Sequence, residues 1–241
     1  MGRAIYVSSV NGDDANSGYA PEKAFRSLKK VNQMEIQPGD QILLERGSVF
    51  VGEYLHLYRG GTKEAPVVVD AYGEGALPRI ETDGNGIWYQ NYGGHLDNVV
   101  HTWKGYLSSA VLLYDAEYIS IRNLEITNNP CVKNERLNQA DRMNRTGVSV
   151  IAKNHGTLHE IELDHLYIHD VEGNIYDKHL NNGGIYMSVS RPDDEEKTGI
   201  ARYDGIHIHH CKVENCRRWG IAAGYTYPVS YTHLRAHETD Q

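Results

Sequence analysis

The chain has 241 residues, a length that allows one elongated domain with a continuous core. Its 32 Asp and Glu residues outnumber its 24 Lys and Arg residues, and the formal net charge of −8 argues against a nucleic-acid partner. No apolar run approaches the roughly 18 residues of a membrane span, and residues 1–10 contain no apolar core of a signal peptide. We therefore expect no nucleic-acid partner and no membrane span.

Residues 1–36 are predicted to form a strand, a loop and a short helix. The strand AIYVSSV begins at Ala4, and a loop rich in Asn, Asp and Gly follows it. Apolar residues then recur at helical spacing, at Phe25, Leu28, Val31 and Met34. We expect this amphipathic helix to cover one end of the core that the rest of the chain builds.

Short strands separated by glycine-rich turns are predicted next, at residues 41–45, 53–57, 67–70 and around residue 80. Residues 82–108 are less regular and carry the aromatic residues Trp88, Tyr89, Tyr92 and Trp103. Aromatic loops over a rigid sheet are either binding walls for sugar rings or packed segments without a binding role. Both interpretations stay open for this segment.

A stretch of eleven residues occurs three times in the second half of the chain, beginning at Ile119, Ile161 and Ile206. Each copy reads apolar, x, apolar, x, Asn or His, apolar, x, apolar, and a second short apolar strand follows it. In that second strand, Val148 and Ile185 are 37 residues apart, and the next equivalent residue comes 36 later. Apolar residues with a period of 2 indicate strands, and a fixed longer period marks a repeat architecture.

These repeats predict an all-β fold, a right-handed parallel β-helix (solenoid) whose stacked coils place like residues in ladders. Each coil supplies three strands; residues 37–227 would form the coils, and residues 1–36 the N-terminal strand, loop and capping helix. Asn123, His165 and His210 occupy the same two-residue corner in successive coils. Because an amide or imidazole there can bond to the neighbouring turn, we expect a structural ladder at this corner and not a catalytic site.

Two segments resemble a known family. Residues 6–57, followed by APVVVDAYGEGALPRI from Ala65, resemble the amino-terminal cap and first coil of pectate-lyase-like right-handed β-helix proteins. The NN…GI units at Asn128 and Asn215 resemble the repeats of that superfamily, so the resemblance covers residues 4–225. It implies a polysaccharide substrate, a secreted or periplasmic location and a monomer when full length. The reaction stays open, because the superfamily includes calcium-dependent lyases, inverting glycoside hydrolases and non-catalytic adhesins.

The end of the chain has a different character. VSYTHLRAHET, from Val229 to Thr239, resembles codon by codon the translation of a transposase-type sequencing adapter. We therefore expect residues 228–241 not to be native, and the natural protein to continue with further coils and a carboxy-terminal cap. The histidines of this tail, His233 and His237, would then have no functional meaning.

By the same resemblance, the cleft lies over the last strand of each coil and the loops that lead into it. Alternation places Ser149, Tyr186 and Ala222 on the outer face of that strand. Two basic residues, Lys153 and Arg191, stand at its far end. The loops bring a mixture of acids and bases: Asp141, Arg142 and Arg145, then Asp170, Glu172, Asp177, Lys178 and His179, then Arg217 and Arg218.

Such a mixture fits β-elimination from an acidic, uronate-containing glycan, in which a base removes a proton beside a carboxylate whose charge rises in the transition state. The candidate catalytic residues are Lys153, Arg191 and Asp170. The candidate Ca²⁺ ligands are Asp170, Glu172 and Asp177. The candidate substrate-binding residues are Tyr186, Lys178, His179, Arg217, Arg218 and Tyr225, with the two arginines as a carboxylate clamp. We therefore expect a polysaccharide lyase.

Two other functions remain open. An inverting glycoside hydrolase on the same fold needs two carboxylates about 6.5 to 9.5 Å apart around a water. Asp170 and Asp177 are candidates for such a pair, together with an acid from a further coil. This enzyme would need no calcium and would release no unsaturated product. A non-catalytic β-helix that binds glycans or proteins is the third alternative, which the unequal loops on one side disfavour.

Overall fold

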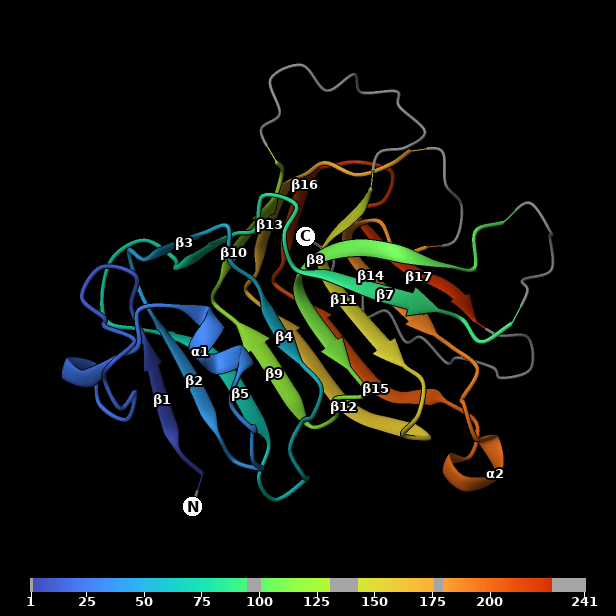
Figure 1. Cartoon of the computed structure of the whole chain (residues 1–241), viewed down its shortest axis with the longest axis horizontal. Helices are drawn as coiled ribbons and strands as arrows, with labels where there is room; N and C mark the ends of the chain where they lie inside the picture. The colour runs from blue at the N-terminus through green and yellow to red at the C-terminus, as the bar shows by residue number, and fades with distance from the viewer. Residues whose placement is uncertain (1, 95–100, 131–142, 176–179, 227–241) are drawn as a thin grey trace.

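The structure is a computed structural model that describes residues 2–94, 101–130, 143–175 and 180–226. Three sheets with parallel neighbouring strands, named A, B and C, make up most of it (Figure 1). Sheet A contains β1 (Ala4–Val7), β2 (Gln41–Glu45), β5 (Val67–Tyr72), β9 (Ile119–Arg122), β12 (Thr157–Asp164) and β15 (Arg202–His209). Sheet B contains β3 (Val49–Val51), β6 (Arg79–Glu81), β10 (Glu125–Asn128), β13 (Tyr167–Val171) and β16 (Lys212–Cys216). Sheet C contains β4 (Leu55–Leu57), β8 (Lys104–Tyr114), β11 (Asn144–Ala152), β14 (Gly183–Val189) and β17 (Ile221–Thr226).

The chain passes through the three sheets in turn and lays each new strand beside the previous strand of the same sheet. Thus β9, β10 and β11 are followed by β12, β13 and β14, and these by β15, β16 and β17. In sheet A, Ile161 pairs with Ile119 on one side and with Ile206 on the other. The prediction of an all-β fold with repeats stacked in register is confirmed at this level.

The ladders of apolar residues fill the space between the sheets. Ile119, Ile161, Val148 and Ile185 are all buried in one continuous core. Burial of each such side chain stabilises the fold by about 1.5–3 kcal/mol. Ile221, which we expected inside, pairs with Ile185 but is 50% exposed in the last described strand.

Two short helices and a 3-10 turn accompany the sheets: α1 (Leu28–Asn32), α2 (Glu195–Thr198) and η1 (Pro21–Lys23). Leu28 and Val31 of α1 join the core, as their spacing predicts. The side-chain amide of Asn32 donates to the backbone oxygen of Tyr54 over 2.8 Å and accepts from the backbone NH of His56 over 2.9 Å. It thereby covers backbone groups at the edge strand β4, which would otherwise invite association. Among the described residues, no helix has the length and hydrophobicity that a membrane crossing requires.

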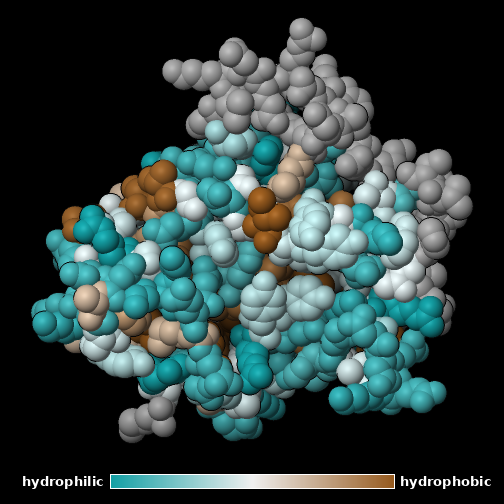
Figure 2. All heavy atoms as spheres, viewed as in Figure 1, coloured by the Kyte–Doolittle hydropathy of each residue, from teal (hydrophilic) through white to brown (hydrophobic). Residues whose placement is uncertain are grey.

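The outer face of sheet C is closed by the aromatic segment. Strand β7 (Ile87–Asn91) runs antiparallel to β8, and Trp88 and Tyr92 pack with Leu112 and Ile151 in a second, smaller core. The packed interpretation is therefore the right one for Trp88 and Tyr92. Tyr89 alternates with these residues and stays 45% exposed. The face of the molecule seen in Figure 2 is mainly hydrophilic with isolated hydrophobic patches.

A buried histidine in β4 makes the stability of the fold depend on pH. The Nε2 atom of His56 lies 2.9 Å from the backbone oxygen of Ser109, and burial lowers the pKa of His56 to about 4. The unfolded chain, with the ordinary histidine pKa of 6.5, takes up its proton first as the pH falls. The free energy of unfolding should therefore decrease by up to about 3 kcal/mol between pH 6.5 and pH 4.

Urea unfolding at a series of pH values measures this decrease. His56→Gln keeps an amide donor for Ser109 but cannot titrate, so its free energy of unfolding should vary less with pH in this range. His207→Gln, at an exposed histidine of β15, is the matched control and should keep the dependence of the unchanged protein. Equal pH dependence of His56→Gln and the unchanged protein would show that His56 is not the group responsible.

Candidate functional site

The residues predicted to share one cleft lie at opposite ends of sheet C. Glu172 lies beside the start of β11, because the guanidinium of Arg145 in that strand donates to its backbone oxygen over 2.6 Å. Lys153 follows the last residue of β11, and Arg191 follows β14. A parallel strand rises about 3.3 Å per residue, so the two ends are about 25 Å apart. The structure therefore does not bring Lys153 or Arg191 together with the predicted residues at the start of β11, Asp170 and Glu172.

Lys153 and Arg191 have other contacts at the far end of sheet C. The ammonium of Lys153 lies 2.7 Å from a carboxylate oxygen of Asp193, and hydrogen bonds from Lys153 and Asn154 lower the pKa of that carboxyl. The backbone NH of Arg191 donates to the backbone oxygen of Tyr92 over 2.7 Å. Arg191 lines a pocket of about 460 Å³ together with Asn91, Gly93, Trp103, Pro192, Asp193 and Glu195. Lys153 is thus the ion-pair partner of Asp193 and not an unpaired base.

Tyr186, a predicted substrate contact, is buried instead. Only 5% of it is exposed, and its ring lies against the backbone of Gly224, where an added Cβ atom would come within 1.9 Å of it. Burial raises the pKa of Tyr186 to about 12. Among the described residues, β7 and Asn181 cover the outer face of this strand and leave no open cleft, through hydrogen bonds such as the one from Gln90 Nε2 to Asn181 Oδ1 at 2.8 Å. The side chain of Tyr225 lies outside the described part of the structure.

Buried amides fill the corner where the chain passes from sheet B to sheet C, which we name the B–C corner. Its members are Asn128, Asn144, Arg145, Glu172, Gly173, Asn174 and Asn182. The amide of Asn128 accepts from the backbone NH of Gly84 over 2.9 Å and donates to the backbone oxygen of Thr146 over 3.0 Å. Such amides satisfy backbone groups that leave one ladder before they join the next.

Gly173 is required at the B–C corner by a close approach. The Oδ1 atom of Asn182 accepts from the backbone NH of Arg145 over 3.1 Å, and its Nδ2 atom donates to the backbone oxygen of Asn174. A Cβ atom on Gly173 would lie 2.0 Å from that Oδ1 atom and 2.8 Å from that NH. Any side chain at position 173 would therefore break the contact that fixes the start of β11.

Asn144 is the exception among the buried amides. It is 2% exposed at the start of β11, and neither its Nδ2 nor its Oδ1 atom has a hydrogen-bond partner among the described residues. Leaving a buried amide unpaired costs about 1–3 kcal/mol. Such a group in a folded protein calls for a functional explanation, for example a polar ligand that completes its hydrogen bonds.

Asp170 is held at the B–C corner by a bulge in β13. His169 pairs with Thr127 and Val171 with Asn128, so Asp170 is an extra residue in the strand, with a φ of 50°. Bulges of this kind re-aim a side chain and are frequent next to active sites. The carboxylate of Asp170 is 50% exposed.

His169 connects Asp170 to a second carboxylate. Its Nδ1 atom lies 2.7 Å from Oδ2 of Asp170, and its Nε2 atom lies 3.0 Å from Oε1 of Glu125. A neutral imidazole has one N–H group, so His169 can donate to one carboxyl group while it accepts a proton from the other. The three groups can therefore pass a proton to and from the exposed carboxyl of Asp170.

One of the two predicted clamp arginines forms an ion pair with one of the predicted calcium ligands. The Nε atom of Arg217 lies 2.9 Å from Oε2 of Glu172, which is 19% exposed. Arg218 contacts the ring of Trp219 at 5.9 Å. Asp177, Lys178 and His179 lie outside the described residues. Of the predicted set, the structure thus brings Asp170, Glu172 and Arg217 to one corner.

Calcium has no complete ligand set among the described residues. Glu172 is bound by Arg217, and Asp170 faces His169. The one group of described residues whose potential ligand atoms come close together is Asp164, His165 and His210, at the other end of β13. Because Asp177 lies outside the described residues, calcium at Asp170 stays a prediction.

Sequence reasoning missed His169, Asn144, Gly173 and Asn182. A signal exists for the amides, because paired asparagines directly precede glycines at Asn181-Asn182-Gly183-Gly184. His169 has no comparable signal, since it follows the core residue Ile168 just as Thr127 follows Ile126 in the preceding strand of sheet B. Its role becomes visible only from the distances to its two carboxylate partners.

Comparisons with known proteins identify glycoside hydrolases as relatives. No family model matches the chain. A lacto-N-biosidase of Bifidobacterium longum subsp. longum is 38% identical over 262 residues, covering 95% of this chain and 16% of that protein. Two crystal structures of a GH136 lacto-N-biosidase from Eubacterium ramulus, native and selenomethionine forms, each have 56% identity and a TM-score of 0.90. The matches cover 94% of this chain for the selenomethionine form, 93% for the native form, and 36% of each solved chain.

These similarities correct two predictions. The pectate-lyase-like resemblance and the prediction of a polysaccharide lyase are wrong, because the relatives are glycoside hydrolases, the class that was expected above only as an alternative. The similarity supports hydrolysis but not, by itself, inversion at the anomeric carbon. The chain spans well under half of either relative, and over nearly all of its own length it is similar to GH136 lacto-N-biosidases.

Proposed function

We propose that the chain is part of a glycoside hydrolase that cleaves lacto-N-biosides. The observation that supports this proposal most is the similarity to the Eubacterium ramulus lacto-N-biosidase, with 56% identity over 94% of this chain. We carry the substrate class over from the name of that enzyme. The secreted or periplasmic location and the monomeric state of the full-length protein remain predictions.

The topology supports a β-helix as the scaffold of this enzyme. The chain visits sheets A, B and C in a fixed order and returns to each sheet beside its previous strand. We infer that this path is the right-handed parallel solenoid that the repeats predict. Rigid stacked strands would then hold the loops at the B–C corner, where a binding site needs fixed side chains.

We propose Asp170 and Asp177 as the carboxylate pair of the reaction. Glycoside hydrolysis uses one carboxyl group to protonate the leaving oxygen and a second carboxylate as base or nucleophile. Asp170 is half exposed on a bulge, whereas Glu172 beside it is paired with Arg217. Asp177 follows seven positions later in the sequence between β13 and β14, outside the described residues.

The surroundings of Asp170 favour the role of general acid for this residue. A general acid must release a proton to the leaving group and recover it before the next turnover. His169, hydrogen-bonded to both Asp170 and Glu125, offers a path for that recovery. Asp177 would then act as the base or nucleophile.

Substitution of either aspartate should abolish hydrolysis while the fold remains. In the full-length protein, we expect Asp170→Asn and Asp177→Asn each to lower kcat/KM by at least about 100-fold, because an amide neither donates a catalytic proton nor attacks. Release of para-nitrophenol from a para-nitrophenyl lacto-N-bioside measures the rate. Asp204→Asn, at an exposed residue of β15, is the matched control and should stay near the unchanged rate.

The same assay tests the assignment of the two aspartates separately from the proposed glycosidase activity. If the unchanged protein hydrolyses the glycoside and Asp170→Asn does so equally well, the function stands and the assignment of Asp170 fails. If the unchanged protein leaves the glycoside intact, the proposed function fails.

Replacement of Asn144 by leucine should separate stability from activity. Because the amide of Asn144 has no partner within the part of the chain that the structure describes, we expect its removal to leave the free energy of unfolding unchanged or to raise it by up to about 1–3 kcal/mol. If Asn144 binds substrate, kcat/KM should fall about tenfold, the effect of one lost hydrogen bond. Asn182→Leu, at a buried amide with partners for both polar atoms, is the control and should lose stability. Equal losses of stability in the two variants would contradict a binding role for Asn144.

A further inference from the structure

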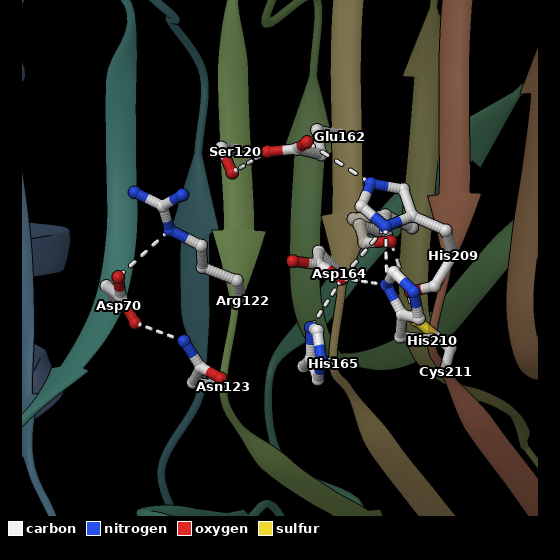
Figure 3. A network of polar contacts seen from close by, with 11 residues as sticks. Asp70, Ser120, Arg122, Asn123, Glu162, Asp164, His165, His209, His210 and Cys211 are labelled. Carbon is white, nitrogen blue, oxygen red and sulfur yellow. Dashed lines mark hydrogen bonds and ion pairs between the residues drawn. The ribbon is translucent and has the colours of Figure 1, made fainter.

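The corner between sheets A and B carries a second set of polar residues (Figure 3). Arg122, Asp164 and His209 occupy one register position in neighbouring strands of sheet A. The corner residues Asn123, His165 and His210 follow them directly, each with a φ between 49° and 56°. The expected ladder at this corner is therefore present, and the rings of His165 and His210 stack with centroids 4.6 Å apart.

Where the ladder reaches Asp70 of β5, both oxygens of that carboxylate accept a hydrogen bond. The Nε atom of Arg122 donates to Oδ2 of Asp70 over 2.9 Å, and the Nδ2 atom of Asn123 donates to Oδ1 over 2.8 Å. Each carboxylate oxygen of Asp70 thus faces a donor that always carries hydrogen. The contacts of Asp70 with Arg122 and Asn123 therefore have a purely structural explanation.

In the following repeats, three histidines surround one carboxylate oxygen, Oδ1 of Asp164. The Nδ1 atoms of His165, His209 and His210 lie 2.6, 2.9 and 3.0 Å from Oδ1 of Asp164, as Figure 3 shows. The Nδ1 atoms of His209 and His210 are also 2.9 Å from each other. Two ring nitrogens at that distance share at most one proton, so the cluster presents more lone pairs than hydrogen atoms when the imidazoles are neutral.

The distances between these atoms are close to those between the ligand atoms of a tetrahedral metal ion. With metal–ligand bonds of about 2.0–2.1 Å, the ligand atoms of a tetrahedral site are about 3.3 Å apart. The ligand atoms of Asp164, His165 and His210 all lie within 4.8 Å of one another. Small outward movements of two exposed rings, 56% and 64% exposed, would open the cluster to that geometry.

We propose that Asp164, His165 and His210, with His209 beside them, bind a divalent transition-metal ion of the zinc class. Imidazole nitrogen with one carboxylate oxygen suits Zn²⁺, whereas Ca²⁺ and Mg²⁺ take oxygen ligands. The Nε2 atom of His209 lies 3.2 Å from Glu162, which accepts a hydrogen bond from Ser120 over 2.5 Å. A carboxylate behind an imidazole orients it for metal binding in this way.

Charge and access favour the bound state. The carboxylate of Asp164 is only 17% exposed and lies against all three imidazoles, so it brings a negative charge to the place where a cation would bind. A hollow of about 370 Å³ beside the cluster, lined by residues that include Asn123, Tyr167 and Lys212, reaches the surface. An ion can therefore enter without local unfolding.

The ion would join two successive coils. Asp164 ends β12 and His165 follows it, while His209 ends β15 and His210 follows it, so the bound ion would tie the two strands at their shared corner. A ligand that binds only the folded chain stabilises it. This role does not depend on the proposed glycosidase activity.

Titration of the chain with ZnCl₂ in a calorimeter, and thermal unfolding with and without Zn²⁺, test the proposal. We expect His165→Asn and His210→Asn each to weaken Zn²⁺ binding by about tenfold or more and to remove the Zn²⁺-dependent rise in Tm. Asparagine is the matched substitution, because Asn123 already occupies this corner at a positive φ in the coil below. His207→Asn, on the same strand β15, is the control.

The histidines of the tail, His233 and His237, are present in every variant and contribute equally to each titration. Unchanged affinity and stoichiometry in both His→Asn variants would overturn the proposal. Titration of the unchanged protein with Co²⁺ needs no variant to fold. We expect an intense visible absorption band from tetrahedral nitrogen and oxygen ligation, and its absence would also overturn the proposal.

Discussion

In-register stacking of parallel strands is the constraint on which the rest of the structure depends. Val67, Ile119, Ile161 and Ile206 pair one above another in sheet A, and the core between the sheets is built from such ladders. A slip of one residue would move every apolar side chain of a strand from the core to the surface. The same register decides which polar residues meet at the corners, so the core and the candidate sites have one origin.

Both candidate sites lie at corners between two sheets. The outer face of sheet C is closed by Trp88 and Tyr92, while buried amides collect at the B–C corner, where backbone groups change partners. Asp170 is presented there by a bulge, a local break in the register. At the corner between sheets A and B, histidines replace the arginine and asparagine of the coil below.

Much of the scaffold could be predicted from the sequence. Stacked strands directly produce an alternation of apolar and polar residues and the period of 36 to 37 residues that separates Val148, Ile185 and Ile221. The closure of sheet C could not be predicted, because β7 alternates like any other strand and its antiparallel pairing with β8 leaves no separate pattern. The roles of the charged loop residues could not be predicted either, because their partners are distant in the sequence. Lys153 and Asp193 are 40 positions apart, and composition does not tell a paired charge from an exposed one.

Cross-linking of neighbouring coils tests the stacking most directly. Ser120 and Glu162 pair on the outer face of sheet A, and neighbouring strands are about 4.8 Å apart, within the Cα separation that a disulfide allows. Oxidation of the double variant Ser120→Cys with Glu162→Cys should join the peptides that contain these positions, as detected by mass spectrometry. The out-of-register pair Ser120→Cys with Asp164→Cys should not cross-link. Equal cross-linking of both pairs, or cross-linking of the second alone, would contradict the account.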